Sequence, residues 1–303
     1  MDNLLSAQTE EDFSKARNRA LFNDIQHFLQ PAETKLLSFT DIKKWLKPKT
    51  EIYVGMKEIP VDHIVGSEGR YNDFDNHFFP KAPHLKSRWK SIDAARLSDI
   101  ILPPIKLYEI GGLYFVRDGN HRVSVARSQG VAYIDGEVIS LQSEIKLRPG
   151  MSKNQILKKV LEYEKRLFYA ETAFGDITDC WNLDFSSPGQ YDVIYNHIQI
   201  HKYYINENQK EEISMVDAIA SWYTQVYEPV ITTVQKQKIL KKFRKRTSGD
   251  MYVWLIRYWH DLKEKYGEDI SLDAAARDFK SFHKKNIFTR FCEFLFRKND
   301  SAT

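Results

Sequence analysis

The sequence predicts an α+β protein in which a mixed α/β domain lies between an N-terminal helical arm and a helical C-terminal domain. Three observations lead to this prediction. Apolar residues recur at near-helical spacing before residue 30. Short apolar runs separated by turn residues, which are typical of strands, occupy residues 51–140. After residue 150 the apolar pattern is again mostly helical. We therefore expect three parts, at 1–48, 49–148 and 149–303.

The N-terminal arm is predicted to contain two helices. Residues 10–29 carry apolar side chains at helical spacing, and Pro31 ends the pattern. A shorter helix follows Phe39, with Thr40 and Asp41 as its N-terminal polar residues and with Trp45 and Leu46 among its apolar ones.

The middle part reads as strands around one short helix. Residues 51–64 hold a strand candidate followed by a turn, and Gly111-Gly112 joins two further strands in a hairpin. The helix that begins near residue 120 ends at Gly130, and a last strand follows it. Residues 83–99 are basic through Lys86, Arg88, Lys90 and Arg96. They could cover the candidate site at residues 118–122 or contact a nucleic-acid backbone, but a solvated helix with Trp89 buried is favoured.

The C-terminal part is predicted to be helical in the segments 152–171, 189–206, 213–227, 229–246, 249–266 and 271–282. Ser214 and Asp217 form an N-terminal capping pattern for the third of these. The aromatic residues of this part are expected to form its core; they are Trp222, Tyr223, Tyr227, Trp254, Tyr258 and Trp259.

Composition limits the functional classes. The chain has 303 residues and a net charge of +4, too small a charge to establish a polyanionic partner. No apolar run approaches the roughly 18 residues of a membrane span, so we expect no transmembrane segment. Two cysteines cannot build a disulfide framework or a cysteine-rich zinc site. The acidic N-terminus lacks the apolar stretch of a secretory signal, so we expect a cytoplasmic protein.

The residues from Asp118 to Arg122 carry the strongest chemical signal. An apolar strand ends at Asp118, Gly119 permits an unusual backbone turn, and a helix then begins. The free N–H groups and the dipole of a helix N-terminus favour an anion, and His121 and Arg122 add side-chain donors there. Arg122 is suited to bidentate phosphate binding. Asp118 is a candidate for holding Mg²⁺ or for accepting a proton. The alternative is a structural turn in which Asp118 caps the helix and Arg122 pairs with a neighbouring carboxylate.

The stretch DGNHRVSVARSQG resembles the phosphate-binding motif of the ParB/sulfiredoxin superfamily, also called the ParB-like nuclease domain. IPVDHIVGSEGRYNDFD is similar to that superfamily's opening element, and ILPPIKLYEIGGLYFVRDG to its central hairpin. The resemblance covers about residues 51–140 and implies a ParB/sulfiredoxin-like α/β fold for that part. The C-terminal half resembles an uncharacterised bacterial helical domain, which implies no activity.

Within the superfamily the motif is most similar to the Asp-Gly-His-His-Arg motif of the free serine kinases. Sulfiredoxins place a catalytic cysteine where this chain has Asn120, so the resemblance does not extend to their thiol chemistry. Partition-type ParB proteins carry a Gly-Glu-Arg-Arg-like motif at this turn. The kinase resemblance implies that Asp118 takes part in phosphoryl transfer, with Glu68 as its partner carboxylate and Arg70 as a further phosphate contact.

These observations lead to a phosphotransferase or NTPase hypothesis. A nucleotide (ATP, ADP or CTP) with Mg²⁺ would lie against Gly119, Asn120, His121 and Arg122, together with Arg70. Asp118 or Glu68 would accept the proton of a small hydroxyl acceptor, and Asp118 would also touch the metal. Hydrolysis of the nucleotide, or its binding as a switch, stays open.

Two other classes remain. A nucleotide-gated DNA-binding regulator of transcription or partition would use the basic residues 236–246, with contacts from Lys241, Lys242, Arg244 and Lys245. The favoured alternative for this segment is a solvated basic helix end, where cations are stabilised by the helix dipole. A metal-dependent nuclease would have Asp118, Glu68 and Asp73 as candidate ligands. A homodimer is compatible with the aromatic helices.

Two further segments have a structural interpretation and a functional one. His197 and His201 have the i, i+4 spacing of a metal pair, but a structural role is favoured because no Glu lies between them in the HExxH arrangement. The aromatic segment 284–298 is expected to pack within the protein or a dimer rather than on a membrane surface.

Overall fold

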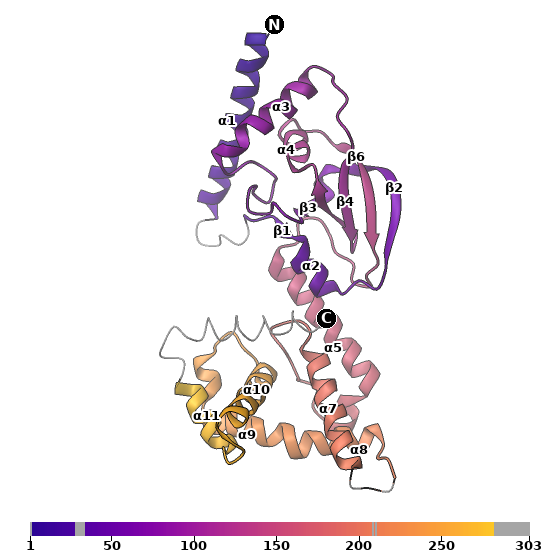
Figure 1. Ribbon diagram of the computed structural model, residues 1–303, viewed down its shortest axis with the longest axis vertical. Coiled ribbons are helices and arrows are strands. Elements are labelled where there is room, and N and C mark those ends of the chain that lie inside the picture. The colour runs from indigo at the N-terminus through magenta and orange to yellow at the C-terminus, as the bar shows by residue number, and fades with distance from the viewer. Residues whose placement is uncertain (1, 28–33, 208, 210, 282–303) are drawn as a thin grey trace. The chain divides into compact units, whose positions relative to one another are not determined.

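The computed structural model describes residues 2–27, 34–207, 209 and 211–281 (Figure 1). The chain divides into two compact units, Met1–Val160 and Leu161–Thr303, which are described separately. The fold class is confirmed: a mixed sheet is flanked in sequence by an N-terminal helix and by a helical C-terminal region. The boundaries proposed at residues 48 and 148 stay predictions.

Within the described residues, the first unit contains a six-stranded sheet in the order β1-β3-β5-β4-β6-β2. Its strands are β1 (Leu37–Ser38), β2 (Glu51–Pro60), β3 (Ile64–Ser67), β4 (Ile105–Ile110), β5 (Leu113–Asp118) and β6 (Tyr133–Leu141). The predicted hairpin is present, because β4 and β5 pair antiparallel across Gly111 and Gly112, which both have positive φ. By contrast β3 pairs parallel to β5, its neighbour in the sheet centre.

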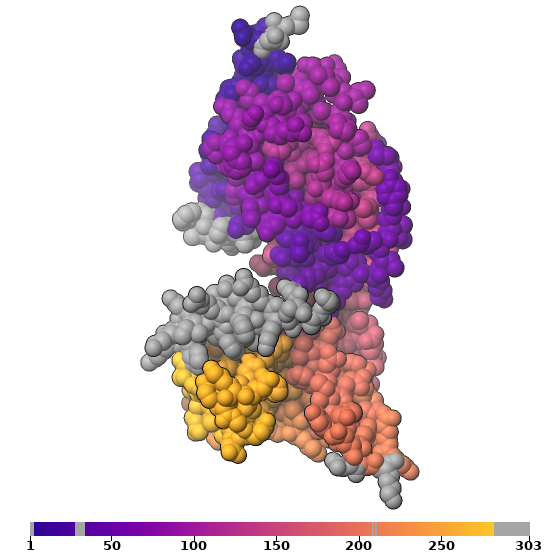
Figure 2. Space-filling model, in the orientation of Figure 1, coloured from indigo at the N-terminus to yellow at the C-terminus, as the bar shows by residue number. Residues whose placement is uncertain are grey.

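The helices of the first unit are α1 (Asp2–Gln26), α2 (Phe39–Leu46), α3 (Lys86–Leu97) and α4 (Asn120–Ser128). Thus α1 begins earlier than predicted, whereas α2 begins where predicted. The α2 helix is capped by Ser38, whose side chain accepts from the Asp41 amide, rather than by Thr40. Figure 2 shows α1, in indigo, lying along the surface of the first unit.

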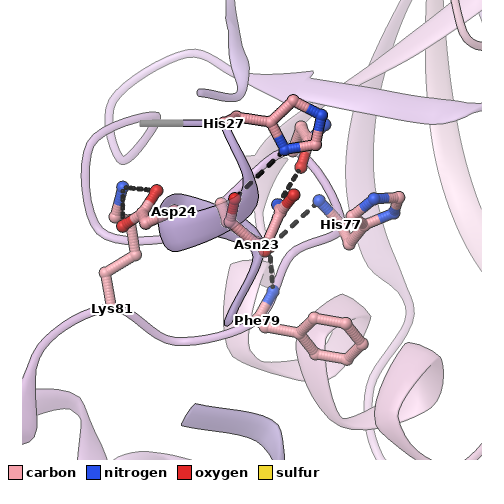
Figure 3. A network of polar contacts seen from close by, with 8 residues as sticks. Asn23, Asp24, His27, His77, Phe79 and Lys81 are labelled. Carbon is pink, nitrogen blue, oxygen red and sulfur yellow. Dashed lines mark hydrogen bonds and ion pairs between the residues drawn. The ribbon is translucent and has the colours of Figure 1, made fainter. Parts of the chain in front are cut away.

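A buried carboxylate, Asp75, connects α1 to the loop that precedes α3. Figure 3 shows its partners Asn23, His77 and Phe79 close together. Its Oδ1 accepts from the backbone N–H groups of His77 and Phe79, and its Oδ2 accepts from the Asn23 side chain at 2.9 Å. Burial raises the pKa of Asp75, and these hydrogen bonds act in the opposite direction. Nearby, Lys81 pairs with Asp24 at 2.9 Å. The loop and the end of α1 are therefore held together by several polar contacts.

The position of α3 is fixed by Trp89, which is fully buried as predicted. Its indole N–H donates to Ser124 Oγ on α4 at 2.9 Å, and its ring packs edge-on against Phe13 of α1. Because one side chain contacts both helices, α3 is set between α1 and α4. This placement determines which α3 residues lie near the start of α4.

The second unit is helical throughout its described secondary structure. After α5 (Lys153–Thr172), which spans the unit boundary, come α6 (Phe174–Thr178), α7 (Gln190–Asn206), α8 (Met215–Trp222), a π-helical turn (Tyr223–Tyr227), α9 (Glu228–Lys236), α10 (Ser248–Tyr266) and α11 (Leu272–Ser281). Ser214 caps α8 as predicted. Five of the six predicted aromatic residues belong to the core: Trp222, Tyr227 and Tyr258 are buried, with Tyr223 and Trp254 packed against them. The sixth, Trp259, is half-buried outside this core, and its indole N–H donates to the Ile270 carbonyl at 2.7 Å.

The predicted helix over 229–246 is wrong in its second half. Helix α9 ends at Lys236, Lys238 adopts a left-handed conformation (φ 54°), and a 3-10 turn follows at Ile239–Lys242. The left-handed residue ends the helical path. Beyond it, Ile239 and Phe243 are both buried. The basic residues around them lie on an irregular surface segment rather than on one helix.

In the part of the chain that the structure describes, no helix is both long and apolar enough to cross a membrane. The segment 284–298 and Cys292 lie outside the described residues.

Candidate anion-binding site at the start of α4

The sheet brings the predicted site residues together from two distant segments. Strands β3 and β5 are parallel neighbours, with Ser67 paired with Val116. The chain segments that leave their carboxyl ends therefore emerge at the same edge of the sheet. Arg70 follows β3, whereas Asp118 ends β5, and both side chains line one cleft.

The turn between β5 and α4 requires glycine. Gly119 has φ 108°, a region that side-chain-bearing residues rarely adopt. A Cβ atom added there would lie 2.5 Å from Cγ2 of Ile105. Within the described residues, no side chain caps the first N–H groups of α4, and the carboxylate of Asp118 pairs with Arg122 instead. The N–H groups of the first helical turn are left for another partner.

A cleft of about 500 Å³ lies in front of this helix start. Among the described residues, its lining is Arg70, His84, Leu85, Arg88, Ile92, Asp118, Gly119, Asn120, His121 and Arg122. Three guanidinium groups and two imidazoles thus face a single carboxylate. The structure therefore brings together Arg70 and all five residues from Asp118 to Arg122. This balance of charge, together with the helix dipole, favours a bound anion.

Glu68 is not part of this lining. Its backbone N–H donates to the Val116 carbonyl at 3.0 Å, which continues the β3–β5 ladder, and its side chain is exposed. The proposed pairing of Glu68 with Asp118 thus has no geometric support within the cleft.

His84 and Arg88 complete the cleft. Neither was predicted as a site residue, although the segment 83–99, which includes Arg88, was considered as a possible cover for the site. The hydrogen bond from Trp89 to Ser124 holds α3 beside α4. Arg88, which precedes Trp89 in the sequence, therefore reaches the cleft. Lys86 and Lys90, one turn apart, instead both pair with Glu10 of α1. The sequence feature that could have pointed to His84 and Arg88 is the basic composition of residues 83–99 around a single tryptophan.

Arg122 fixes the carboxylate of Asp118. Its Nη2 lies 2.5 Å from Asp118 Oδ2, and its Nη1 donates to the carbonyl oxygens of Pro103 and Pro104. The Arg122 side chain is 12% exposed and that of Asp118 is 65% exposed. Three of the five guanidinium donors are therefore engaged, so Arg122 positions Asp118 and has only two donors left for a ligand.

His121 is held in its neutral form. Arg70 Nη1 lies 3.1 Å from His121 Nε2, and because a guanidinium can only donate, Nε2 accepts and Nδ1 carries the proton. Burial, and then the charge of Arg70, lower the pKa of His121 to about 4. At neutral pH the imidazole is an uncharged donor through Nδ1.

Two buried polar atoms in the first turn of α4 have no partner among the described residues. They are Nδ1 of His121 and Oδ1 of Asn120, and the Asn120 side chain is 8% exposed. An unpaired buried polar group costs about 1–3 kcal/mol. One donor and one acceptor, both unpaired and beside the free helix N–H groups, are the arrangement expected of a ligand site.

The cleft offers little to a metal on its own. Within the described ranges, Asp118 is the only carboxylate of the lining, and no group of three His, Cys, Asp or Glu residues is gathered as a metal site. This donor set fits Mg²⁺ that is held mainly by the phosphates of a ligand, with Asp118 as one protein contact.

The other predicted candidates lie in the second unit. Lys241, Lys242, Arg244 and Lys245 are all exposed, and Lys242 Nζ donates to the Lys280 carbonyl at 2.9 Å. His197 and His201 contact the hydroxyl groups of Tyr252 and Ser221, respectively.

Comparisons with known proteins give a weak structural likeness and no sequence match. No family model matches the sequence, and no curated protein matches it significantly. Among solved structures, the chain is similar to one described as the "C2221 form of Pnob8-like ParB-N domain". The two are 11% identical over 76% of this chain and 89% of that chain, with a TM-score of 0.23. At these values the likeness assigns neither a family nor an activity.

The turn at Gly119 generates a stability prediction. Gly119→Ala and Gly130→Ala both place a side chain at positive φ, which costs about 1–2 kcal/mol. Only at Gly119 would the new Cβ also clash, whereas nothing lies within 4 Å at Gly130. We expect Gly119→Ala to lower the free energy of unfolding of the first unit by roughly 1–3 kcal/mol more than Gly130→Ala. Urea unfolding of both variants measures the difference, and equal losses would contradict the steric argument.

Proposed function

We propose that the cleft at the start of α4 binds the phosphate groups of a nucleotide, and that the protein transfers the terminal phosphoryl group to a small hydroxyl acceptor or to water. The observation that carries the proposal is the convergence of an uncapped helix N-terminus with Arg70, Arg88 and His121 around one fixed carboxylate. The resemblance of DGNHR to the free serine kinase motif of the ParB/sulfiredoxin superfamily supports the same conclusion.

Each group has a distinct part in this proposal. The N–H groups of Asn120, His121 and Arg122 donate to phosphate oxygens, and His121 Nδ1 adds a neutral donor. Arg70 and Arg88, both exposed, offset the phosphate charge as the ligand enters. Oδ1 of Asn120 accepts from a hydroxyl or amine of the ligand.

Asp118 is the proposed proton acceptor. Arg122 holds its Oδ2, and its other oxygen is available to the attacking hydroxyl. Phosphoryl transfer requires mainly positioning and electrostatic stabilisation, which the cleft supplies through its cations and helix N–H groups. Mg²⁺, where bound by the phosphates and Asp118, would offset charge on the phosphoryl oxygens.

Nucleotide binding is tested by calorimetric titration with ATP, ADP, CTP and GTP, each with Mg²⁺. Because charge-assisted hydrogen bonds contribute about 1.5–3 kcal/mol, Arg70→Ala and Arg88→Ala should each weaken binding roughly tenfold or more. Arg117→Ala is the matched control, since Arg117 adjoins Asp118 in sequence but does not line the cleft. Binding of none of the four nucleotides, or binding unchanged in both cleft variants, would contradict the proposal.

Phosphoryl transfer is tested separately from binding. Asp118→Asn should lower turnover, with serine, other hydroxyl compounds or water as acceptor, by about 10²–10⁴-fold, the usual contribution of a general base. Its nucleotide affinity should change only a few-fold. Glu68→Gln is the matched control and should leave turnover near that of the unaltered protein, because Glu68 lies outside the cleft lining. Full turnover in Asp118→Asn would contradict the assignment of Asp118 as the base. Absence of turnover in the unaltered protein would leave a site that only binds.

A second candidate function, nucleic-acid binding, is favoured by the exposed cations at 241–245. Buried Ile239 and Phe243 anchor this segment, while Lys241, Arg244 and Lys245 are exposed. Such an array suits the phosphate backbone of DNA.

This second candidate predicts DNA affinity that falls as salt rises. Replacing Lys241, Arg244 and Lys245 together with Gln should reduce both the affinity and the salt dependence, by up to about 0.9 in slope per lost phosphate contact. The control replaces three exposed basic residues of the first unit, Lys57, Lys106 and Arg117. Equal DNA binding by the two triple variants, measured by fluorescence anisotropy, would exclude this surface.

A further inference from the structure

The second unit has a pocket of its own, between α7, the π-helical turn after α8, and α10. Its volume is about 570 Å³, within the range of small-molecule sites. Most of its lining is apolar or aromatic, including Val193, Ile200, Trp222, Val226, Val253 and Ile256. We call it the α7–α10 pocket. Nothing in the proposed chemistry at α4 uses it.

Besides the hydroxyl groups of Tyr204 and Tyr252 and the indole N–H of Trp222, the polar side chains of the lining are nitrogen bases. His197, His201, Arg257 and His260 line the pocket, and no Asp or Glu is among the described residues that do so. Arg257 is half-buried and forms no ion pair with any residue that the structure describes. Its guanidinium donors can therefore pair with the acidic head of a bound anion.

The two α7 histidines are oriented by neutral hydroxyl groups. His197 Nδ1 lies 3.1 Å from the Tyr252 hydroxyl, and His201 Nε2 lies 2.9 Å from Ser221 Oγ. Each ring thus has a second nitrogen available for a ligand. Burial lowers the pKa of both rings, and for His197 the charge of Arg257 adds to this effect. Arg257 is then the principal fixed charge of the pocket.

We propose that the α7–α10 pocket binds an amphipathic organic anion, with its aromatic or aliphatic body among the apolar side chains and its acidic head on Arg257. Charge complementarity favours an anion, because the lining carries a guanidinium and histidines and, within the described ranges, no Asp or Glu. The apolar walls favour a ligand with an aromatic or aliphatic body. A carboxylate, a sulfonate and a phosphate share the head-group chemistry that an arginine recognises.

Two fluorescent probes of the same shape test this proposal on the full-length chain. 8-Anilinonaphthalene-1-sulfonate carries an acidic head, whereas N-phenyl-1-naphthylamine has nearly the same body without it. The anionic probe should bind saturably at one site, and the neutral probe should bind roughly tenfold or more weakly, as expected for loss of a charged hydrogen bond. In Arg257→Gln the anionic probe should lose this advantage, and the two affinities should become similar.

Two further variants exclude other causes. Arg277→Gln makes the same change at an exposed arginine of the second unit that does not line the pocket, and should leave both affinities unchanged. Ile200→Asp places an acid at an exposed position of the lining and should weaken the anionic probe more than the neutral one.

Three outcomes would overturn the proposal. They are equal affinity for the two probes, anionic binding that persists in Arg257→Gln, and probe binding that disappears as the protein self-associates. The last would assign the pocket to a second copy of the chain. None of these readouts depends on the α4 cleft, so the two proposals fail independently.

Discussion

The sharp turn at Gly119 is the constraint on which the candidate site depends. Strand β5 is central in the sheet, and α4 must begin directly after it for Val123 and Val125 to reach the buried core. Only a glycine can make this connection, because φ is positive and Ile105 occupies the space of a Cβ. The same turn leaves the first N–H groups of α4 uncapped. The backbone path that closes the core therefore also creates the anion-binding helix start.

The second wall of the cleft depends on a different contact, the hydrogen bond from Trp89 to Ser124. Helix α3 carries several cations, and its orientation decides which of them act on the site. Lys86 and Lys90 face Glu10 of α1, whereas Arg88 faces the cleft. The N-terminal arm is thus joined to the site through α3. Its own attachment is secured by Asp75, whose buried carboxylate binds both α1 and the loop before α3.

The parts of this arrangement that depend on neighbouring residues were predictable from the sequence. The parts that depend on contacts between distant segments were not. The hairpin and α4 were predictable because glycines mark their turns and apolar residues keep their period. Strands β1 and β3 were not, because they are short and pair in parallel with distant segments. The helix expected through residue 246 failed because the left-handed turn at Lys238 has no distinct residue signal. In the site, the contiguous residues from Asp118 to Arg122 were identified from the turn and the resemblance. The presence of His84 and Arg88 in the cleft depends on how α3 packs, and the contacts of Arg122 with Pro103 and Pro104 depend on the position of β4. Neither feature could be predicted from neighbouring residues in the sequence.

The central claim is that the N–H groups at the start of α4 bind phosphate. The most direct test is a ¹H–¹⁵N NMR titration of the labelled full-length chain with inorganic tripolyphosphate, which carries the phosphate chain of a nucleotide without its base. The account predicts saturable shifts of the amide resonances of Asn120, His121 and Arg122, with little change at Gly130 at the other end of the helix. Shifts confined to residues 241–245, or no saturable shift at all, would contradict it.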